Sequence, residues 1–291
     1  MPGLTTCDAR NALQECYRLC PDAVSQAGQS VFQCSFADRR TMFLKTFDPI
    51  FSDKADALGS LCAFISRTGL TPRLAADCNG ELIPIFKGTR LMLQFSGQTG
   101  NDGALTRGTP CPELFAQALS ALHEALRNYS EAPPLHSHLE QDPQVLSDFA
   151  CQLGLPEHVE ALHRTAGVRR QIIHGDLHPG NILLNSRGVI FLDFDSACVA
   201  PPRREAAFAA YRLFQTPSNR RLFLDAYVRE TGGPLFEFRE MHEHLFHVIL
   251  SRIHFILMSA TRHETRFLYD LPLQMQRLEE IRQALSTETK Q

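Results

Sequence analysis

The sequence lacks any pair of cysteines separated by two residues, any dense basic tract and any apolar signal core at its start. Its nine cysteines are scattered without the spacing of a zinc site, which favours reduced thiols and a cytoplasmic protein. The formal charge of -3 and the pI near 6.5 provide little attraction for nucleic acid or anionic lipid. We therefore expect neither a nucleic-acid partner nor a membrane partner.

Long uninterrupted apolar runs are also missing. The most apolar late stretch, LFHVILSRIHFILMSA, is broken by Arg252 and His254. No internal repeat and no low-complexity tract occurs. A chain of 291 residues with this ordinary globular composition predicts a sizeable core and about two lobes.

The first third of the chain favours a small antiparallel sheet. Residues 9–20 predict a short amphipathic helix, and SVFQCSF and TMFLKTF predict a hairpin around the turn ADRR. A helix that ends near Gly69 precedes two further strands, ELIPIFKG and RLMLQFSG. The polar segment that follows predicts a boundary between an N-terminal lobe of residues 1–96 and a C-terminal lobe of residues 97–291.

The remainder favours helices, and the whole chain therefore an α+β fold. Apolar residues recur at helical spacing from Phe115 to Tyr129, and residues 144–153 and 156–166 also predict helices. From about Arg203 onward the chain is expected to be helical throughout.

The most informative stretch is IIHGDLHPGNILL, followed by VIFLDFD. It places Asp176 and Asn181 in a loop after one short apolar strand, and Asp193 and Asp195 after another. An aspartate can accept a hydroxyl proton, and amide and carboxylate oxygens suit Mg²⁺. Phosphoryl transfer also needs positive charge on the phosphates, which Lys45 in MFLKTF can supply. The alternative is a surface turn with solvated acids at a strand end.

These motifs resemble the aminoglycoside phosphotransferase and choline kinase superfamily of small-molecule kinases. His174, Asp176 and Asn181 keep the spacing of the protein-kinase catalytic loop, and the variant H-G-D-x-H-P-G-N favours the small-molecule branch. The resemblance follows most of the chain in order and is most specific over residues 172–196. It implies a bilobal protein-kinase-like fold, with a small β-sheet N-lobe, a mainly helical C-lobe, and ATP between them.

The resemblance also implies roles for the motif residues. Asp176 matches the catalytic base, Asn181 and Asp193 match the Mg²⁺ ligands, and His174 matches the residue that supports the loop. We expect His178 to brace the same loop. Asp195 is either a ligand of a second metal ion or a solvent-facing acid.

The nucleotide site follows the family pattern less closely. Lys45 matches the lysine that contacts the phosphates, but the helix after it lacks the glutamate that usually pairs with this lysine. Asp56 is the nearest substitute for that partner in the nucleotide site, and Glu81 or no partner are the alternatives. No glycine-rich loop precedes Lys45, and the only candidate turn over the phosphates is 28–30.

Gln94, Phe95 and Ser96 occupy the expected position of the adenine-binding hinge. Such a hinge recognises the base through backbone groups, which any residue supplies. His123 and Glu205 match positions with structural roles in the family, and we assign neither of them to catalysis.

The acceptor is expected to contact the C-terminal helices. Between Ser196 and Gln291 there are 13 Lys and Arg against 11 Asp and Glu, without the acidic excess that suits a polycationic aminoglycoside. A neutral, zwitterionic or partly anionic hydroxyl compound fits better. His247, Ser251 and His254 share one helix face and are either pocket-lining residues or ordinary polar-face or core residues.

We therefore expect an ATP- and Mg²⁺-dependent phosphotransferase that phosphorylates a hydroxyl group of a small metabolite. A homoserine-like compound or another amino alcohol is the preferred acceptor, with an aminoglycoside or a protein Ser/Thr side chain as alternatives. A nucleotide-binding pseudokinase that acts as an interaction module is an alternative of another class. The sequence does not predict the oligomeric state.

Overall fold

The computed structural model describes residues 4–28, 30–38, 40–47, 55–96, 106–130, 142–166, 169–186, 188–261 and 265–288. The chain packs into two compact units, each made of separate segments. The first unit comprises Met1–Pro110, Asn128–Pro133 and Gly180–Asp195, and the second comprises Cys111–Arg127, Pro134–Pro179 and Ser196–Gln291. The lobe boundary expected at residue 97 lies outside the described residues and stays a prediction.

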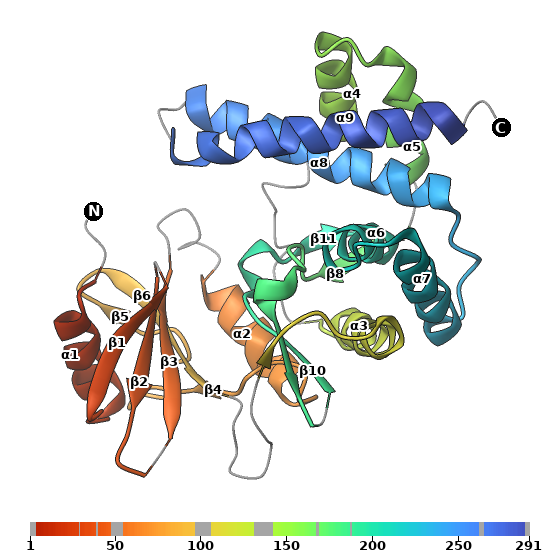
Figure 1. Ribbon diagram of the computed structural model, residues 1–291. Coiled ribbons are helices and arrows are strands. Elements are labelled where there is room, and N and C mark those ends of the chain that lie inside the picture. Colours follow the sequence, from red (N-terminus) through yellow and green to blue (C-terminus); the bar gives the residue numbers. More distant parts are fainter. Residues whose placement is uncertain are drawn as a thin grey trace. The chain divides into compact units, whose positions relative to one another are not determined.

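The first unit is built around an antiparallel sheet (Figure 1) with the strand order β1-β2-β3-β6-β4, in which β5 also pairs with β6. The expected hairpin is confirmed as β2 and β3, with Val31 opposite Lys45. The edge strand β1 was not expected, because its side chains are mostly exposed and show no alternation. The strands are β1 Ala23–Gly28, β2 Val31–Ser35, β3 Thr41–Thr46, β4 Leu74–Ala75, β5 Ile85–Phe86 and β6 Thr89–Phe95.

Helix α1 (Thr6–Tyr17) packs against one face of this sheet. A capping box holds its start, since the Thr5 hydroxyl accepts from the Asp8 N–H while the Asp8 side chain accepts from the Thr5 N–H. Leu13 and Leu44 belong to the core between helix and sheet. Because side chains alternate along a strand, Lys45 projects from the other face of β3.

The first unit also contains α2 (Ala55–Ser66) and a second sheet with the order β10-β9-β7. The hairpin expected after the catalytic loop is confirmed as β9 and β10, with Ile182 opposite Phe191. The strands of this sheet are β7 Thr106–Arg107, β9 Ile182–Asn185 and β10 Gly188–Phe191.

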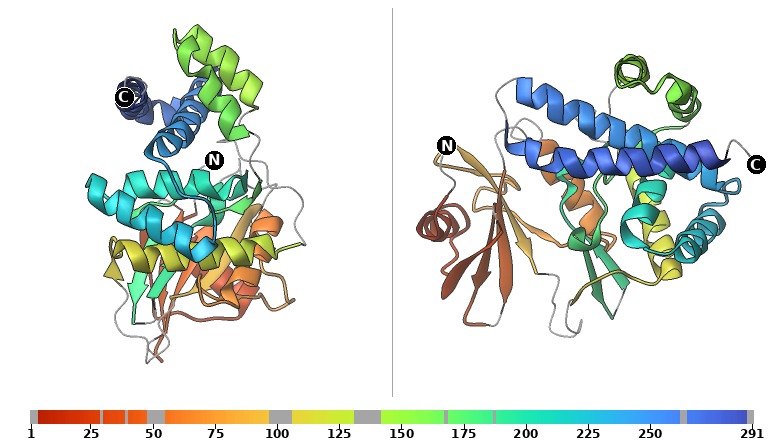
Figure 2. Two further views of the ribbon diagram at one scale, coloured as in Figure 1. Left: turned by 90° about the vertical axis from the view of Figure 1, so that its right-hand side faces the viewer. Right: turned by 45° about the horizontal axis from the view of Figure 1, so that its top comes forward.

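The second unit is mainly helical, as expected. Figures 1 and 2 show α8 and α9 side by side and α3 against α7, and these helices are in contact. Two short strands, β8 (Gln171–Ile173) and β11 (Cys198–Ala200), precede and follow the catalytic motif in the sequence and pair with each other. The helices are α3 Pro112–Arg127, α4 Pro143–Gln152, α5 Val159–Ala166, α6 Pro202–Leu213, α7 Pro217–Thr231, α8 Phe238–Thr261 and α9 Leu271–Glu288, with the 3-10 helices η2 Pro156–His158 and η5 Thr265–Asp270.

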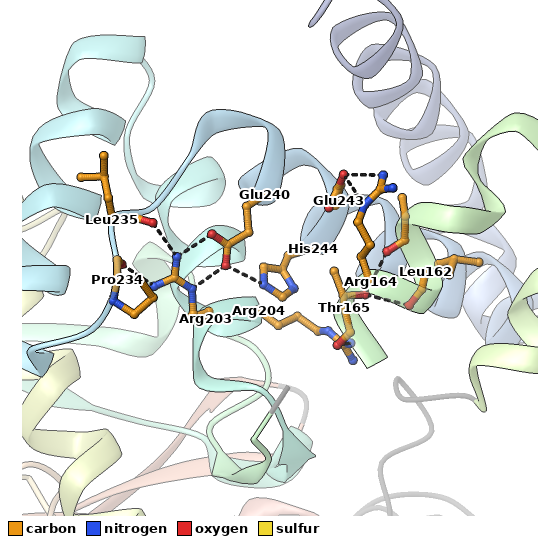
Figure 3. A network of polar contacts seen from close by, with 11 residues as sticks. Leu162, Arg164, Thr165, Arg203, Arg204, Pro234, Leu235, Glu240, Glu243 and His244 are labelled. Atoms are coloured by element: carbon orange, nitrogen blue, oxygen red, sulfur yellow. Dashed lines mark hydrogen bonds and ion pairs between the residues drawn. The ribbon is translucent and has the colours of Figure 1, made fainter. Parts of the chain in front are cut away.

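A polar network holds the start of α6 to α8 and to the segment before it (Figure 3). The Nε of Arg203 donates to Glu240 Oε1 at 2.5 Å, and its terminal nitrogens donate to the carbonyls of Pro234 and Leu235. The Nε2 of His244 lies 3.5 Å from the same glutamate carboxylate. Because most of these groups are partly buried, the pairs are worth more than exposed ones and fix the register of α6 against α8.

Helix α8 is long and apolar enough to cross a membrane by length and composition alone, with a mean hydropathy of 1.2 over an 18-residue window. However, 56% of that window is buried inside the protein. The helix contacts α4, α5, α6 and α9. This burial is typical of a central helix in a helical core.

Candidate active site

Lys45 lies at the centre of a cluster of charges in the first unit. Its Nζ is 2.5 Å from Asp193 Oδ1 and 2.8 Å from Asp195 Oδ1, although its side chain is only 9% exposed. Burial alone would lower the pKa of Lys45, but the charges of Asp195 and Asp193 raise it. The ammonium group therefore stays charged and keeps its capacity to bind phosphate.

The two aspartates reach the lysine through a turn that follows strand β10. Strand β10 ends at Phe191, and Asp193 adopts a φ of 63° just before the 3-10 helix η4 (Phe194–Ser196). Aspartate tolerates this left-handed conformation better than most residues. Burial raises the pKa of Asp195, Lys45 opposes that shift, and Asp193 adds to it.

The donor set of the first unit fits a divalent cation. Two carboxylates share the single ammonium group of Lys45, which leaves negative charge to be compensated. Asn181 belongs to the same unit, and its carbonyl accepts from the Leu192 N–H at 2.9 Å, one residue before Asp193. Magnesium usually binds one or two carboxylates and completes its shell with water and substrate phosphates. Asn181, Asp193 and Asp195 are therefore suited to hold Mg²⁺.

No larger acidic or histidine cluster among the described residues competes for the metal. Within the ranges that the structure describes, no group of three His, Cys, Asp or Glu side chains is arranged to hold an ion. An ion at Asp193 would thus depend on Asn181 and on the phosphates of a nucleotide, as in phosphoryl-transfer sites generally.

The expected pairing of Asp56 with Lys45 is not formed. Asp56 is 71% exposed and bonds Arg90 Nη1 at 2.5 Å instead. Glu81 lies in a turn where its N–H donates to Asp77 Oδ1 at 2.8 Å. Asp56, in the first turn of α2, therefore pairs with the guanidinium group of Arg90. Asp193 and Asp195 pair with the ammonium group of Lys45 instead.

The hinge residues are tied into the sheet more fully than expected. Gln94 and Phe95 end β6, the Phe95 N–H donates to the Arg73 carbonyl, and the Ser96 N–H donates to the Thr41 carbonyl at 3.0 Å. The N–H groups of Phe95 and Ser96 are therefore already bonded within the sheet, and adenine recognition at Gln94, Phe95 and Ser96 stays a prediction. Residues 97–105, which follow, lie outside the described residues.

The candidate turn over the phosphates joins β1 to β2. Gly28 ends β1 opposite Val31, and the Ser30 carbonyl accepts from the Thr46 N–H at 2.8 Å, next to Lys45. Gln29, between them, lies outside the described residues. A covering role for this turn stays a prediction.

The catalytic loop of the second unit holds Asp176 in place. The Asp176 N–H donates to Nδ1 of the fully buried His174 at 3.3 Å, and His178 Nε2 lies 3.6 Å from Asp176 Oδ2. Gly175, between His174 and Asp176, has a φ of 85°, and a Cβ at this position would stand 2.1 Å from the Ser196 carbonyl oxygen. Only glycine fits this position.

Glu205, at the start of α6, holds this loop through hydrogen bonds to its backbone. Its carboxylate accepts from the N–H groups of His174 at 3.1 Å and Gly175 at 2.6 Å, and meets His123 Nε2 at 2.9 Å. His123 in turn bonds the Tyr227 hydroxyl at 2.8 Å. Burial alone would raise the pKa of Glu205, but the bonds from His123 and from Gly175 lower it. These contacts agree with structural roles for Glu205 and His123.

A guanidinium group that the sequence did not predict also contacts the proposed base. Arg212 Nη1, in the last turn of α6, donates to Asp176 Oδ1 at 3.1 Å. Arg212 lies 36 residues beyond Asp176. Arginine is common in the last turn of a helix, so no local pattern distinguishes Arg212.

The face of α8 that carries His247 and Ser251, for which pocket lining was one alternative, is buried. His247 and Ser251 are at most 1% exposed, and His254 packs on Phe149 with ring centroids 5.1 Å apart. Arg252, from the next position on α8, lines a cavity together with Asp176. The prediction of pocket lining by His247 and Ser251 is therefore not supported by this cavity.

Comparison with solved structures relates this fold to small-molecule kinases. Choline kinase LicA from Streptococcus pneumoniae is 14% identical with a TM-score of 0.66, and the match covers 96% of this chain and 98% of that chain. Amicoumacin kinase hAmiN in complex with AMP-PNP, Ca²⁺ and Ami is 13% identical with a TM-score of 0.64, covering 90% and 91%. The GDP and kanamycin complex of APH(2")-IIia is 13% identical with a TM-score of 0.62, covering 94% and 98%. The expected α+β bilobal kinase-like fold is confirmed.

A search of the curated proteins gives no match. The sequence model of the phosphotransferase enzyme family, in contrast, matches residues 23–244, a span that includes Lys45 and the whole catalytic motif. Because this match covers well over half of the chain, the protein belongs to the phosphotransferase enzyme family and is a phosphotransferase that acts on hydroxyl groups.

Proposed function

We propose that this phosphotransferase moves the γ-phosphate of Mg²⁺-bound ATP to a hydroxyl group of a small metabolite. The observation that carries the proposal is the contact of Lys45 with Asp193 and Asp195, which gathers one cation and two metal-type ligands in one unit. The nucleotides named for two similar structures, AMP-PNP and GDP, support a nucleotide donor. A cytoplasmic location belongs to the same proposal and rests on the odd number of scattered cysteines.

In this proposal Asp176 accepts the proton of the acceptor hydroxyl as its oxygen attacks the γ-phosphorus. The bond from that phosphorus to the β,γ-bridging oxygen breaks, and ADP leaves. Lys45 orients the phosphates by charge, and Asn181 and Asp193 hold Mg²⁺, which neutralises phosphate charge when bound. Only four residues separate Asp176 from Asn181 in the chain, which supports their action in one site.

The choice of acceptor is a further part of the proposal. A homoserine-like compound or another amino alcohol agrees with the balance of charges between Ser196 and Gln291. An aminoglycoside or a protein Ser/Thr side chain would use the same chemistry. A pseudokinase would bind nucleotide without transferring phosphate.

The test is transfer of labelled phosphate from ATP by the purified protein. The acceptors are a pool of cell metabolites, an aminoglycoside and a generic protein, each with and without Mg²⁺. We expect a labelled small molecule from the wild type, and loss of turnover by a factor of at least about 100 in Asp176→Asn with ATP binding retained. Asp148→Asn, the same change at an exposed position of α4, is the matched control.

Equal turnover by wild type and Asp176→Asn would show that Asp176 is not the base. Nucleotide binding without transfer to any acceptor would favour the pseudokinase.

A further inference from the structure

Two cysteines of the first unit lie next to each other where helix α1 ends. Cys16 is in the last turn of α1, and its carbonyl accepts from the Cys78 N–H at 2.8 Å. The last carbonyls of a helix have no partner within the helix, so the bond from Cys78 satisfies one of them. Folding therefore brings these two cysteines together although they are far apart in the chain.

This hydrogen bond also limits the distance between the two Cα atoms. Only three covalent bonds and one contact of ordinary length separate them, which places them about 4.5–6.5 Å apart. Disulfides join cysteines whose Cα atoms are about 4.4–6.8 Å apart. Both cysteines also line one open groove of about 530 Å³ on the first unit. The backbone thus already has the spacing that a bridge between Cys16 and Cys78 requires.

The turn that carries Cys78 is held by bonds of its own. Asp77 Oδ1 accepts from the N–H groups of Asn79 and Glu81, both at 2.8 Å. The Asp77 N–H donates to the Glu81 carbonyl at 2.8 Å. Because these bonds fix the turn 77–81 from within, Cys78 keeps its place beside α1 without any contribution from its thiol group.

The two thiols differ in their readiness to react. Cys78 is exposed, whereas Cys16 is partly buried. Burial and then the charges of Asp77, Glu15 and Cys78 raise the pKa of the Cys16 thiol, and the effect of Cys78 agrees with the closeness of the pair. Since the thiolate is the form that attacks a disulfide, Cys78 is expected to react first and Cys16 to complete the bridge.

From this geometry we infer that Cys16 and Cys78 form a reversible disulfide, which fastens the end of α1 to the turn 77–81 when the protein meets an oxidising small-molecule disulfide. The inference is independent of the proposed function. Both cysteines are free thiols in this structure, and in a reducing compartment such a bridge is transient and redox-sensing. The bridge restricts the unfolded chain between the two cysteines and so stabilises the first unit.

The exchange is balanced in two steps. The Cys78 thiolate attacks one sulfur of the small-molecule disulfide, and the other half of that molecule leaves as a thiolate. The Cys16 thiolate then attacks Sγ of Cys78, and the remaining half leaves. The two cysteines lose two electrons, which the small molecule gains, and their two protons end on the two released thiols.

The oxidant for the test is hydroxyethyl disulfide, added to the reduced, folded protein. This reagent is neutral, so the acids Glu15, Asp77 and Glu81 in the lining of the groove do not repel it. Free thiols are alkylated after the reaction, and the protein is digested with trypsin and analysed by mass spectrometry.

The peptides identify the bridge without ambiguity. Trypsin yields 11–18 and 74–87, each with a single cysteine, while Cys20 falls in 19–39. We expect peptides 11–18 and 74–87 to be joined by a disulfide that dithiothreitol breaks. In urea, which removes the folded geometry, the shorter loop between Cys16 and Cys20 should be favoured instead.

Oxidation should also change the thermal stability of the first unit. We expect the midpoint of its unfolding transition, measured by calorimetry, to rise by about 5–15 °C. Cys16→Ser and Cys78→Ser should each abolish the linked peptides and this rise. Cys20→Ser, the same change at an exposed cysteine, is the matched control and should keep both. Two variants from opposite sides of the bridge keep the test decisive if one folds poorly.

Three outcomes overturn the inference in distinguishable ways. Mixed disulfides at Cys78 without linked peptides would show that the Cys16 thiol does not reach its partner. A bridge between peptides 11–18 and 19–39 in the folded protein would pair Cys16 with Cys20. Linked peptides 11–18 and 74–87 with an unchanged or lower midpoint would refute the stabilisation of the first unit.

Discussion

Replacing Glu205 with alanine tests whether one buried carboxylate holds the catalytic loop. This side chain is 1% exposed and accepts from two backbone N–H groups and one imidazole nitrogen. Alanine removes the acceptor for the N–H groups of His174 and Gly175, which flank Asp176 on its N-terminal side. Both amides lie in a tightly packed part of the loop, since a Cβ at Gly175 would stand 2.1 Å from the Ser196 carbonyl oxygen.

The expected cost follows from these contacts. Each buried donor left unsatisfied costs about 1–3 kcal/mol, and breaking a buried charged group away from its partners costs about 3–5 kcal/mol. Since the three bonds share one acceptor, their contributions are not additive, and we expect Glu205→Ala to lower the free energy of unfolding of the second unit by about 3–5 kcal/mol. Displacement of the loop by a fraction of an ångström to 1 Å should also lower kcat by roughly 100-fold.

The assay combines urea unfolding, followed by far-ultraviolet circular dichroism, with hydrogen exchange of the peptide that contains residues 172–178. Exchange should become faster at His174 and Gly175 in Glu205→Ala, and kcat is measured where the variant remains folded. Glu205→Gln keeps one oxygen acceptor and should lose roughly half as much stability. Glu160→Gln, at an 81% exposed position of the same unit, should change the free energy of unfolding by less than about 0.5 kcal/mol.

Wild-type exchange at both amides in Glu205→Ala would refute this account of the loop. So would a free energy of unfolding within about 0.5 kcal/mol of the wild type, the range of ordinary surface substitutions.

Three further changes test other parts of the molecule. Lys45→Met should lower kcat/KM for ATP by roughly 100-fold or more, since it removes the charge that meets Asp193, and steady-state kinetics with a folded variant measure this. Asp56→Ala breaks only the exposed pair with Arg90 and should change kcat/KM less than about 3-fold; a larger loss would return Asp56 to the nucleotide site. Burial lowers the pKa of His244 and His247 below the usual 6.5. Because the unfolded chain then binds protons that the folded chain does not, the free energy of unfolding should fall as pH drops below about 6.5, and His247→Asn should flatten this dependence in urea titrations.

The local patterns of the sequence were sufficient for most elements of the fold. Alternating apolar residues identified β2 and β3, and the spacing from Phe115 to Tyr129 identified α3, because each pattern depends on the period of a single element. The edge strand β1 was not predicted, since its side chains are mostly exposed and its sequence shows no alternation of apolar and polar residues. The chemistry of the catalytic loop was also local, because only four residues separate Asp176 from Asn181 in the chain.

Tertiary structure alone decided which charges meet. Lys45 bonds Asp193, 148 residues away, rather than the nearer Asp56, and only packing of distant strands brings such groups together. The same holds for Arg212, which contacts Asp176 at 3.1 Å although this arginine by itself is unremarkable in the sequence. The order of residues in the catalytic motif thus determined the kind of reaction, since its groups are neighbours in the chain. The pairing of charges around Lys45 and Asp176 emerged only from folding, since it depends on side chains from elements that are far apart in the chain.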